Sequence, residues 1–311
     1  MTQTMVKEPR PQHLDSYDGI LLIDKNEGET SFDIVTRLRK ALGQKKVGHA
    51  GTLDPFATGL LIALLGQGTK LFSYLMAGDK RYRASIRLGI ETDTLDPTGR
   101  VVRTMPVPNL KPEDMEKKIL TFVGEIQQTV PAFSAVNIKG KRAYRWAREG
   151  MKLDLPKKIV VIRSVETISI EMPVVTVEVV CSGGTYIRSL AADIGNRLGS
   201  VAHLSSLRRL SSGPFHVNDS INSEKISIAG SANIIKDNLI SLKDSLPDMK
   251  DFHVDIKTAE KIRNGFRPRW NEVEGEGFIK LVNEESLVAI VEVNRLSGDD
   301  TDWLKSIRVF H

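Results

Sequence analysis

The sequence predicts an α+β protein in which a sheet is flanked by helices, followed by a small β-rich module. Two dense runs of Val and Ile, 159–170 and 174–181, have the composition of buried strands. Residues 81–88 alternate polar, mostly basic, side chains with apolar or aromatic ones, which is the period of a strand with one buried face. Residues 187–198 place apolar side chains at helical spacing. The 311-residue length allows one main domain and a small second one.

The N-terminal part predicts a tail, a strand and a helix. Residues 1–18 lack periodicity and contain two prolines, so we expect a flexible tail. Residues 19–24 predict a short buried strand. The following helix is capped by Thr30 or Ser31 and ends at Gly43. Its apolar face is expected to consist of Phe32, Val35, Leu38 and Leu42.

The stretch 46–59 centres on one carboxylate, Asp54. Three glycines in this stretch allow tight turns and the close approach of a ligand. Pro55 disfavours the α region for Asp54 and holds it extended, and the apolar run 60–65 follows as a buried strand. A carboxylate on a stiff loop beside a core strand is a candidate catalytic group. The alternative is an aspartate that caps a turn.

Two later elements hold polar side chains in unusual places. Tyr82 lies on the apolar side of the strand 81–88 despite its neighbouring arginines. Arg188 lies at the start of the helix 187–198, where the helix dipole disfavours a cation. We therefore expect Arg188 to have a specific anionic partner.

The chain becomes polar after Gly213, and Pro247 lies near the end of this polar segment. We place the domain boundary there, which gives a main domain of residues 19–246 and a C-terminal module of residues 247–311. The module contains a short helical segment and two strand-like runs, so it is expected to be β-rich.

The composition describes an ordinary globular protein whose charge is unevenly distributed. It has 41% hydrophobic and 27% charged residues and a net charge of +5. Residues 139–163 contain nine bases and two acids, and residues 34–53 contain no acid. This clustering favours a polyanionic partner, with a solvated basic face as the alternative.

Cys181 is the single cysteine, which excludes an internal disulfide. Since no apolar run reaches membrane-spanning length and the start is too polar for a signal peptide, we expect a cytoplasmic protein.

Several segments match a known family. Residues 48–59 read GHAGTLDPFATG, which closely resembles the signature of TruB-type tRNA pseudouridine synthases. Residues 184–190 (GTYIRSL) resemble the second signature of this family, and residues 203–209 (HLSSLRR) resemble the third. Residues 24–31 resemble its N-terminal motif, with Asn26 where the family usually has proline.

The resemblance implies a pseudouridine-synthase core with a mixed, mainly antiparallel sheet, a PUA-like C-terminal module and an RNA-clasping insertion at about 127–155. It makes Asp54 the catalytic carboxylate, Arg188 its partner and Tyr82 the ring that contacts the target base. The other substrate-binding residues that it implies are His49, Tyr186, Leu207 and Lys25. The RNA-contacting residues that it implies are Lys139, Lys141, Arg142, Tyr144, Arg145 and Arg148.

The implied reaction converts the uridine at position 55 of the TΨC loop of tRNA into pseudouridine, with Asp54 acting on a flipped-out base. This isomerisation needs no cofactor and no metal. The implied partner is the T stem-loop of tRNA, and we expect a monomer. Two alternatives remain open. One is a nucleoside or glycoside hydrolase that pairs Asp54 with Asp93 or Asp96. The other is a non-catalytic RNA-binding or RNA-folding protein.

Overall fold

The structure is a computed structural model that describes residues 17–134, 136–138, 140–151, 154–226, 230–266, 277–284, 286–293 and 304–311, the last range from 304 to 307 by its backbone alone. Most of the predicted N-terminal tail therefore lies outside the described residues.

The elements in chain order are β1 (Gly19–Lys25), α1 (Ser31–Leu42), β2 (Val47–Ala50), β3 (Thr58–Leu65), η1 (Gly66–Leu71), α2 (Phe72–Ala77), β4 (Lys80–Leu88), β5 (Ile90–Thr92), β6 (Val101–Thr104), α3 (Pro112–Leu120), β7 (Gly124–Thr129), β8 (Asn137–Ile138), β9 (Lys141–Arg142), α4 (Ala143–Arg148), β10 (Lys157–Glu171), β11 (Val174–Cys181), α5 (Ile187–Leu198), β12 (Ala202–Ser212), β13 (Phe215–His216), η2 (Val217–Asp219), β14 (Ile221–Asn222), η3 (Ser223–Ile226), α6 (Ser231–Asp237), β15 (Asp251–His253), α7 (Ile256–Arg263), β16 (Gly277–Asn283), β17 (Ser286–Val293) and β18 (Leu304–Val309).

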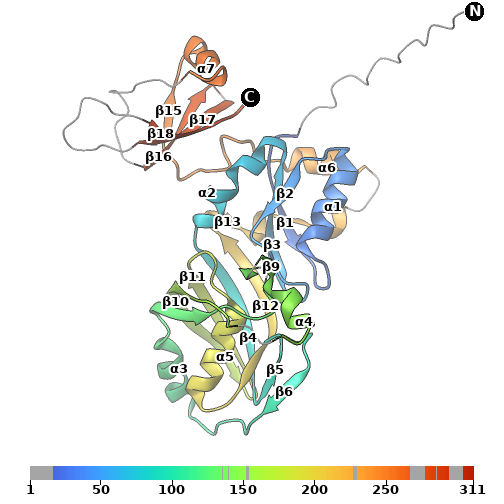
Figure 1. Cartoon of the computed structure of the whole chain (residues 1–311), viewed down its shortest axis with the longest axis vertical. Coiled ribbons are helices and arrows are strands. Elements are labelled where there is room, and N and C mark those ends of the chain that lie inside the picture. Colours follow the sequence, from blue (N-terminus) through green and yellow to red (C-terminus); the bar gives the residue numbers. More distant parts are fainter. Residues whose placement is uncertain are drawn as a thin grey trace, which may run out of the picture.

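The main domain is built on a ten-stranded mixed sheet (Figure 1). Its path runs β14-β1-β3-β12-β4-β11-β10-β7, with β2 beside β3 and β13 beside β12. The β1/β14 and β12/β3 pairs are parallel, and the other pairs are antiparallel. This confirms the predicted α+β class with a mixed, mainly antiparallel sheet.

The two faces of the sheet bury different partners, because successive strand residues point to opposite sides. In β1, Leu21 and Ile23 pack in one hydrophobic cluster with residues of α1, α3 and α5. Ile20 and Leu22 point the other way, toward α2 and the C-terminal module. Both sides of β1 and β3 are therefore covered, which explains why these strands are continuously apolar.

Helix α1 has the caps that the sequence predicts. Thr30 Oγ1 accepts a hydrogen bond from Asp33 N at 3.0 Å, and Asp33 Oδ2 accepts one from Thr30 N at 2.8 Å, which forms a capping box. Gly43 ends the helix with φ 61°. The prediction for Phe32 was wrong, since this side chain is 62% exposed and lies beside Arg39, whereas Ile34 is buried. Phe32 lies in the first turn, at the edge of the stripe that faces the sheet.

The C-terminal module is a four-stranded sheet, ordered β15-β16-β17-β18, with α7 packed on it. This confirms the predicted small β-rich module, while the boundary at residue 247 stays a prediction. Figure 1 shows the module at one end of the elongated molecule. Lys70 Nζ, at the end of η1, donates to Val309 O at 2.7 Å and lies over the ring of Phe310. These contacts join the last strand to the main domain.

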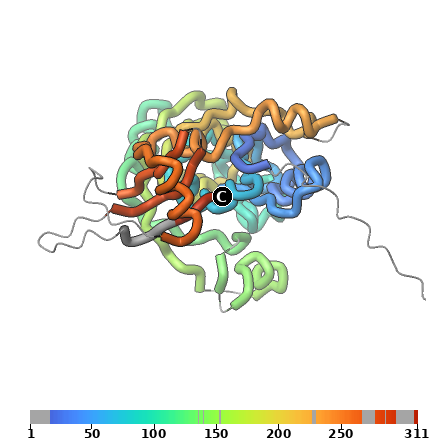
Figure 2. The backbone as a smooth tube through the Cα atoms, turned by 90° about the horizontal axis from the view of Figure 1, so that it is seen from above, coloured from blue at the N-terminus to red at the C-terminus, as the bar shows by residue number. Residues whose placement is uncertain are grey.

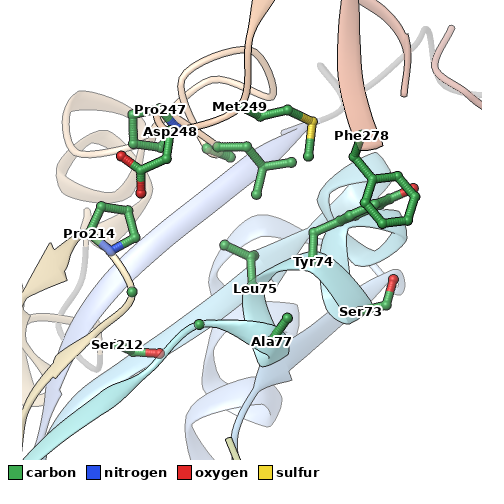
Figure 3. A pocket seen from close by; sticks show the side chains of 14 residues that line it. Ser73, Tyr74, Leu75, Ala77, Ser212, Pro214, Pro247, Asp248, Met249 and Phe278 are labelled. Atoms are coloured by element: carbon green, nitrogen blue, oxygen red, sulfur yellow. The ribbon is translucent and has the colours of Figure 1, made fainter. Parts of the chain in front are cut away.

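A cavity of about 430 Å³ lies where the module meets the main domain (Figure 3). Tyr74 from α2 and Phe278 from β16 meet edge to face there, with ring centroids 5.1 Å apart. Pro247 and Met249 of the connecting segment complete the wall. The lining of this cavity is largely apolar.

Among the residues that the structure describes, none forms a helix long and apolar enough to span a membrane.

Candidate active site

Asp54 lies in the loop between β2 and β3, and the backbone of this loop is fixed on both sides. Ser31 Oγ accepts from Leu53 N at 3.0 Å and lies 3.2 Å from Leu53 O, so the start of α1 holds the residue before Asp54. Gly59 follows the loop with φ 99°, and a Cβ on it would lie 2.3 Å from Arg209 O. Glycine is required at this position because β12 passes so closely.

One guanidinium joins two carboxylates at the centre of the site. Arg188 Nε lies 2.9 Å from Asp54 Oδ2, and Nη2 lies 3.5 Å from Oδ1. Arg188 Nη1 lies 3.3 Å from Asp96 Oδ2. The Arg188 and Asp96 side chains are each 6% exposed, whereas that of Asp54 is 35% exposed. Asp54 is therefore the carboxylate of this trio that faces open space.

Hydrogen bonds from three segments hold this trio in place. Arg188 also donates to Thr94 O at 3.0 Å and to Phe133 O at 2.9 Å. Asp96 Oδ1 accepts from Thr94 Oγ1 at 2.7 Å and from Thr98 N at 3.0 Å. Because charged hydrogen bonds are stronger than neutral ones, Arg188 is locked in a single orientation toward Asp54. The anionic partner expected for Arg188 at its helix start is this pair of carboxylates.

Opposing effects act on the ionisation of Asp54. Burial raises the pKa of the Asp54 carboxyl, and the positive charges of Arg188 and then Lys25 lower it. The negative charge of Asp96 raises the Asp54 pKa further. The net pKa of Asp54 lies above its ordinary value. Asp54 is thus a partly desolvated carboxylate, and without the Arg188 guanidinium its pKa would rise further.

Asp54 opens into a cavity of about 640 Å³ formed by residues distant in the sequence. Of the predicted substrate-binding residues, Tyr82 from β4, Tyr186 before α5 and Leu207 from β12 line this cavity. Gln128 fixes Tyr186 by accepting from its N at 3.1 Å and donating to its O at 3.2 Å. The cavity combines aromatic walls with one open carboxylate, which suits a flat base attached to a sugar.

Lys25 and His49 lie behind the wall of the cavity. Lys25 is fully buried, and its Nζ donates to Asn26 O, Glu29 O and Pro55 O at 2.9, 2.7 and 3.2 Å. Burial lowers the pKa of Lys25 to about 8. His49 lies in β2, where burial and then Arg209 lower its pKa. The structure gives Lys25 contacts with the loop backbone next to Asp54.

The predicted RNA-clasping insertion lies against the opening of the cavity. Tyr144 and Arg148, from α4, line the cavity together with Asp54. Figure 2 shows the α4 segment, in light green, standing off the body of the molecule. Within the insertion, Lys141 lies over the Trp146 ring at 4.4 Å, and Arg148 lies over Tyr144 at 5.5 Å. Arg142 ends β9 and Arg145 lies in α4, and both are exposed, whereas Lys139 lies outside the described residues.

Two family models match consecutive parts of the chain. Residues 39–187 match the N-terminal domain of the TruB family of pseudouridylate synthases, and residues 188–240 match the C-terminal domain of tRNA pseudouridylate synthase B. A tRNA pseudouridine synthase B of Geobacter sulfurreducens is 40% identical, over 94% of this chain and 100% of the relative. One of Borreliella burgdorferi is 39% identical, over 88% and 95%. This chain belongs to the TruB family of pseudouridylate synthases.

Solved structures share the fold of this TruB-family protein. A Cbf5-Nop10-Gar1 complex contains a chain with a TM-score of 0.70 and 22% identity, over 98% of this chain and 87% of that one. The archaeal box H/ACA sRNP Nop10-Cbf5 complex gives 0.69 and 20%, over 97% and 88%. As a pseudouridine synthase, the protein is an isomerase. Among its described residues, no group of three or more His, Cys, Asp or Glu side chains is placed to hold a metal.

Sequence reasoning about this TruB-family enzyme missed two buried cations in the cavity wall, Lys80 and Arg209. Lys80 is 4% exposed and donates to Met76 O at 2.6 Å, and burial lowers its pKa to about 8. Arg209 is 1% exposed and donates to Leu60 O at 2.6 Å. The available signal was the period of two along each strand, because Lys80 lies two positions before the inward-facing Tyr82 and Arg209 lies two positions after the buried Leu207.

Proposed function

We propose that this enzyme isomerises the uridine at position 55 in the TΨC loop of tRNA to pseudouridine, with Asp54 as the catalytic carboxylate. The observation that carries the proposal is the Asp54–Arg188 pair at 2.9 Å, with Asp54 open to a cavity and Arg188 buried behind it. Curated relatives that are about 40% identical over most of their length are named tRNA pseudouridine synthase B. This supports tRNA as the substrate.

The target uridine must leave its stack before it can reach Asp54. Flipping a base costs about a few kcal/mol, which contacts in the pocket must offset. Tyr82 and Tyr186 offer aromatic surfaces on which a uracil ring can stack, and Leu207 offers an apolar contact. These three side chains come from β4, the start of α5 and β12, so the folded sheet assembles the pocket.

Asp54 then acts on the glycosidic bond. Breaking the bond between N1 and C1′ develops positive charge on the sugar, which an ionised carboxylate can stabilise or attack as a nucleophile. The role of Arg188 is to keep Asp54 ionised in a partly dry cavity and to orient it. Asp96 in turn holds the far side of Arg188 at 3.3 Å. The detached uracil rotates, and its C5 rejoins C1′.

The positions of Asp93 and Asp96 argue against the hydrolase alternative. A glycoside hydrolase needs two carboxyl groups that flank the scissile bond. Asp96 is buried behind Arg188 and accepts hydrogen bonds on both of its oxygens. Asp93 Oδ1 accepts from Arg100 N at 2.9 Å and does not line the cavity. Asp96 does line the cavity, but Arg188 engages its Oδ2, and Thr94 and Thr98 engage its Oδ1, so it is not placed to flank a bond opposite Asp54.

The basic insertion supports binding of a folded RNA. Its described cations include Lys141, Arg142, Arg145 and Arg148, interleaved with Tyr144 and Trp146. Cations position an RNA backbone, and aromatic rings stack on unpaired bases. Because α4 also lines the cavity, an RNA held by the insertion would have its loop at Asp54.

The test is to incubate the protein with an unmodified tRNA transcript and to map any pseudouridine in the product. We expect modification at position 55 and at no other uridine of that transcript. An Asp54→Asn variant should bind the same tRNA but form product at least ~10³-fold more slowly, as expected for the loss of an essential nucleophile. Free uracil in the product would support a hydrolase. Full activity of Asp54→Asn would contradict the assignment of Asp54, and an inactive wild type would favour a non-catalytic RNA-binding protein.

A further inference from the structure

Arg209 is a fully buried cation that has no carboxylate partner within the described part of the chain. Its Nε donates to Leu60 O at 2.6 Å, and its Nη2 donates to Gly51 O at 2.9 Å. An unpaired buried charge is costly, so a position such as this one calls for a further electrostatic partner. Arg209 also lines the cavity that holds Asp54.

Tyr82 lies directly across the sheet from Arg209. The two residues are paired in the antiparallel register of β4 and β12, so their side chains share one face. The Arg209 guanidinium lies beside the Tyr82 hydroxyl, and both side chains line the cavity. The other ionisable groups around the phenol are Cys181 from β11, Asp54 from the loop and Lys80 from β4.

The proposed reaction has a second half that Asp54 does not explain. After C5 has bonded to C1′, this carbon still carries its hydrogen, which must leave before pseudouridine is formed. Under the proposed function, Tyr82 is one of the two tyrosines of the cavity on which the base can stack. A neutral phenol is a weak base, however, and burial raises the pKa of Tyr82 while the charge of Arg209 opposes that rise.

We propose that Arg209 is a positioning residue that stabilises the phenolate of Tyr82, so that the Tyr82 oxygen removes the proton from C5. This inference rests on the proposed function. The phenolate oxygen forms an O–H bond as the C5–H bond breaks, and the released electron pair becomes the C5=C6 double bond. The N1=C6 electron pair moves to N1, which takes a proton from water. The hydroxide left behind then takes the Tyr82 proton, which restores phenolate and water.

The test uses the full-length protein, an unmodified tRNA transcript and the same transcript with deuterium at C5 of its uridines. Single-turnover rates are measured between pH 6 and about 9.5, the range below the pKa of a free phenol. We expect Arg209→Met to slow product formation at neutral pH by about 10²-fold, which is typical for impaired proton transfer. The C5 isotope effect should become larger than in wild type, and the rate should rise toward higher pH.

Arg209→Lys keeps a positive charge and should recover part of the rate. Incorporating 3-fluorotyrosine at position 82 lowers the phenol pKa, so in the Arg209→Lys background it should recover more of the rate at neutral pH. The matched control is Arg208→Met. Arg208 is the next residue of β12 but points away from the cavity, where it forms a two-point ion pair with Asp24 at 2.9 and 2.7 Å. This control should keep the isotope effect and pH profile of wild type.

Several outcomes would overturn the inference. One is a slow Arg209→Met with an unchanged isotope effect and pH profile, because Arg209 would then serve only the backbone of the loop. Another is a fully active Arg209→Met. If Arg209→Met does not fold, the same measurements are made on Arg209→Lys. The inference is then overturned if this variant has the isotope effect and pH profile of wild type and does not respond to 3-fluorotyrosine at position 82. A wild type that makes no pseudouridine in tRNA refutes the proposed function instead, before any Arg209 variant is measured.

Discussion

Arg188 binds Asp54 with its Nε at 2.9 Å and Asp96 with its Nη1 at 3.3 Å, so one buried cation connects the open carboxylate to a closed one. This arrangement makes the orientation and the ionisation of Asp54 depend on a residue more than a hundred positions away in the sequence. Asp54, its counter-ion Arg188 and the second acid Asp96 therefore act as one electrostatic unit.

The first prediction concerns the counter-ion. Arg188→Met should lower the single-turnover rate by about 10²-fold or more, the range for loss of a preorganised electrostatic group. It should also destabilise the fold, because Asp96 would remain buried without its partner. Adding Asp96→Asn should recover melting temperature but not activity. The control is Arg197→Met, in the last turn of the same helix. Equal losses of single-turnover rate in Arg188→Met and Arg197→Met would contradict this role of Arg188.

The second prediction concerns the effect of Asp54 on stability. Since the pKa of Asp54 is raised in the folded protein, the folded state binds a proton more readily than the unfolded chain does. Ionised Asp54 therefore lowers stability at neutral pH, and this penalty is lost progressively as the pH falls from the folded-state pKa to the ordinary pKa of an aspartate in the unfolded chain. Asp54→Asn should melt at a higher temperature than wild type at pH 7 while being inactive. The difference should shrink near pH 4, and a variant that melts lower than wild type at pH 7 would contradict the prediction.

The third prediction concerns Asp96. Its negative charge raises the pKa of Asp54, so Asp96→Asn should lower that pKa. Under the proposed function, activity requires ionised Asp54, so the acidic limb of the pH–rate profile should move to lower pH. The maximal rate should fall, since Arg188 loses one of the groups that hold it. Thr98→Val, which removes one hydrogen bond to Asp96 and keeps its charge, should leave the limb in place. A shift of the acidic limb to higher pH in Asp96→Asn would contradict this argument.

Much of the fold could be predicted because its strands follow simple periods. The alternation in β4 placed Ala84, Ile86 and Leu88 inside, as the structure confirms. The error at Phe32 arose because helical spacing gives a stripe but not its exact edge. That edge depends on which part of α1 the sheet covers.

Some residues of the candidate site could be predicted from the sequence and others could not. A local motif pointed to Asp54, and the helix start of Arg188 pointed to an anion. Arg209 was not predicted, because its burial depends on carbonyl oxygens of Gly51 and Leu60, which are about 150 residues away in the chain. Asn26, where the family usually has proline, exchanges hydrogen bonds with Asn222 at 3.4 and 3.2 Å. Such long-range partners follow from the tertiary fold and leave no local signal.

The fourth prediction concerns the basic insertion. Replacing Lys139, Lys141 and Arg142 by Gln should weaken tRNA binding and reduce its dependence on salt, by about one unit of the log–log slope for each lost phosphate contact. The rate at saturating protein should change little, because neither Lys141 nor Arg142 lines the cavity. Filter binding at several salt concentrations measures the slope, and a single-turnover assay measures the rate.

The control for this triple variant replaces Lys111, Lys117 and Lys118, which lie at and within α3. Figure 1 shows α3 on the opposite side of the domain from α4. Both triple variants remove the same charge from the protein, so a general effect of net charge would appear equally in the two. A contact with RNA through the insertion predicts that only the first variant loses affinity at low salt. Equal affinities and equal slopes for wild type and the insertion variant would show that the insertion does not bind the tRNA backbone through these cations.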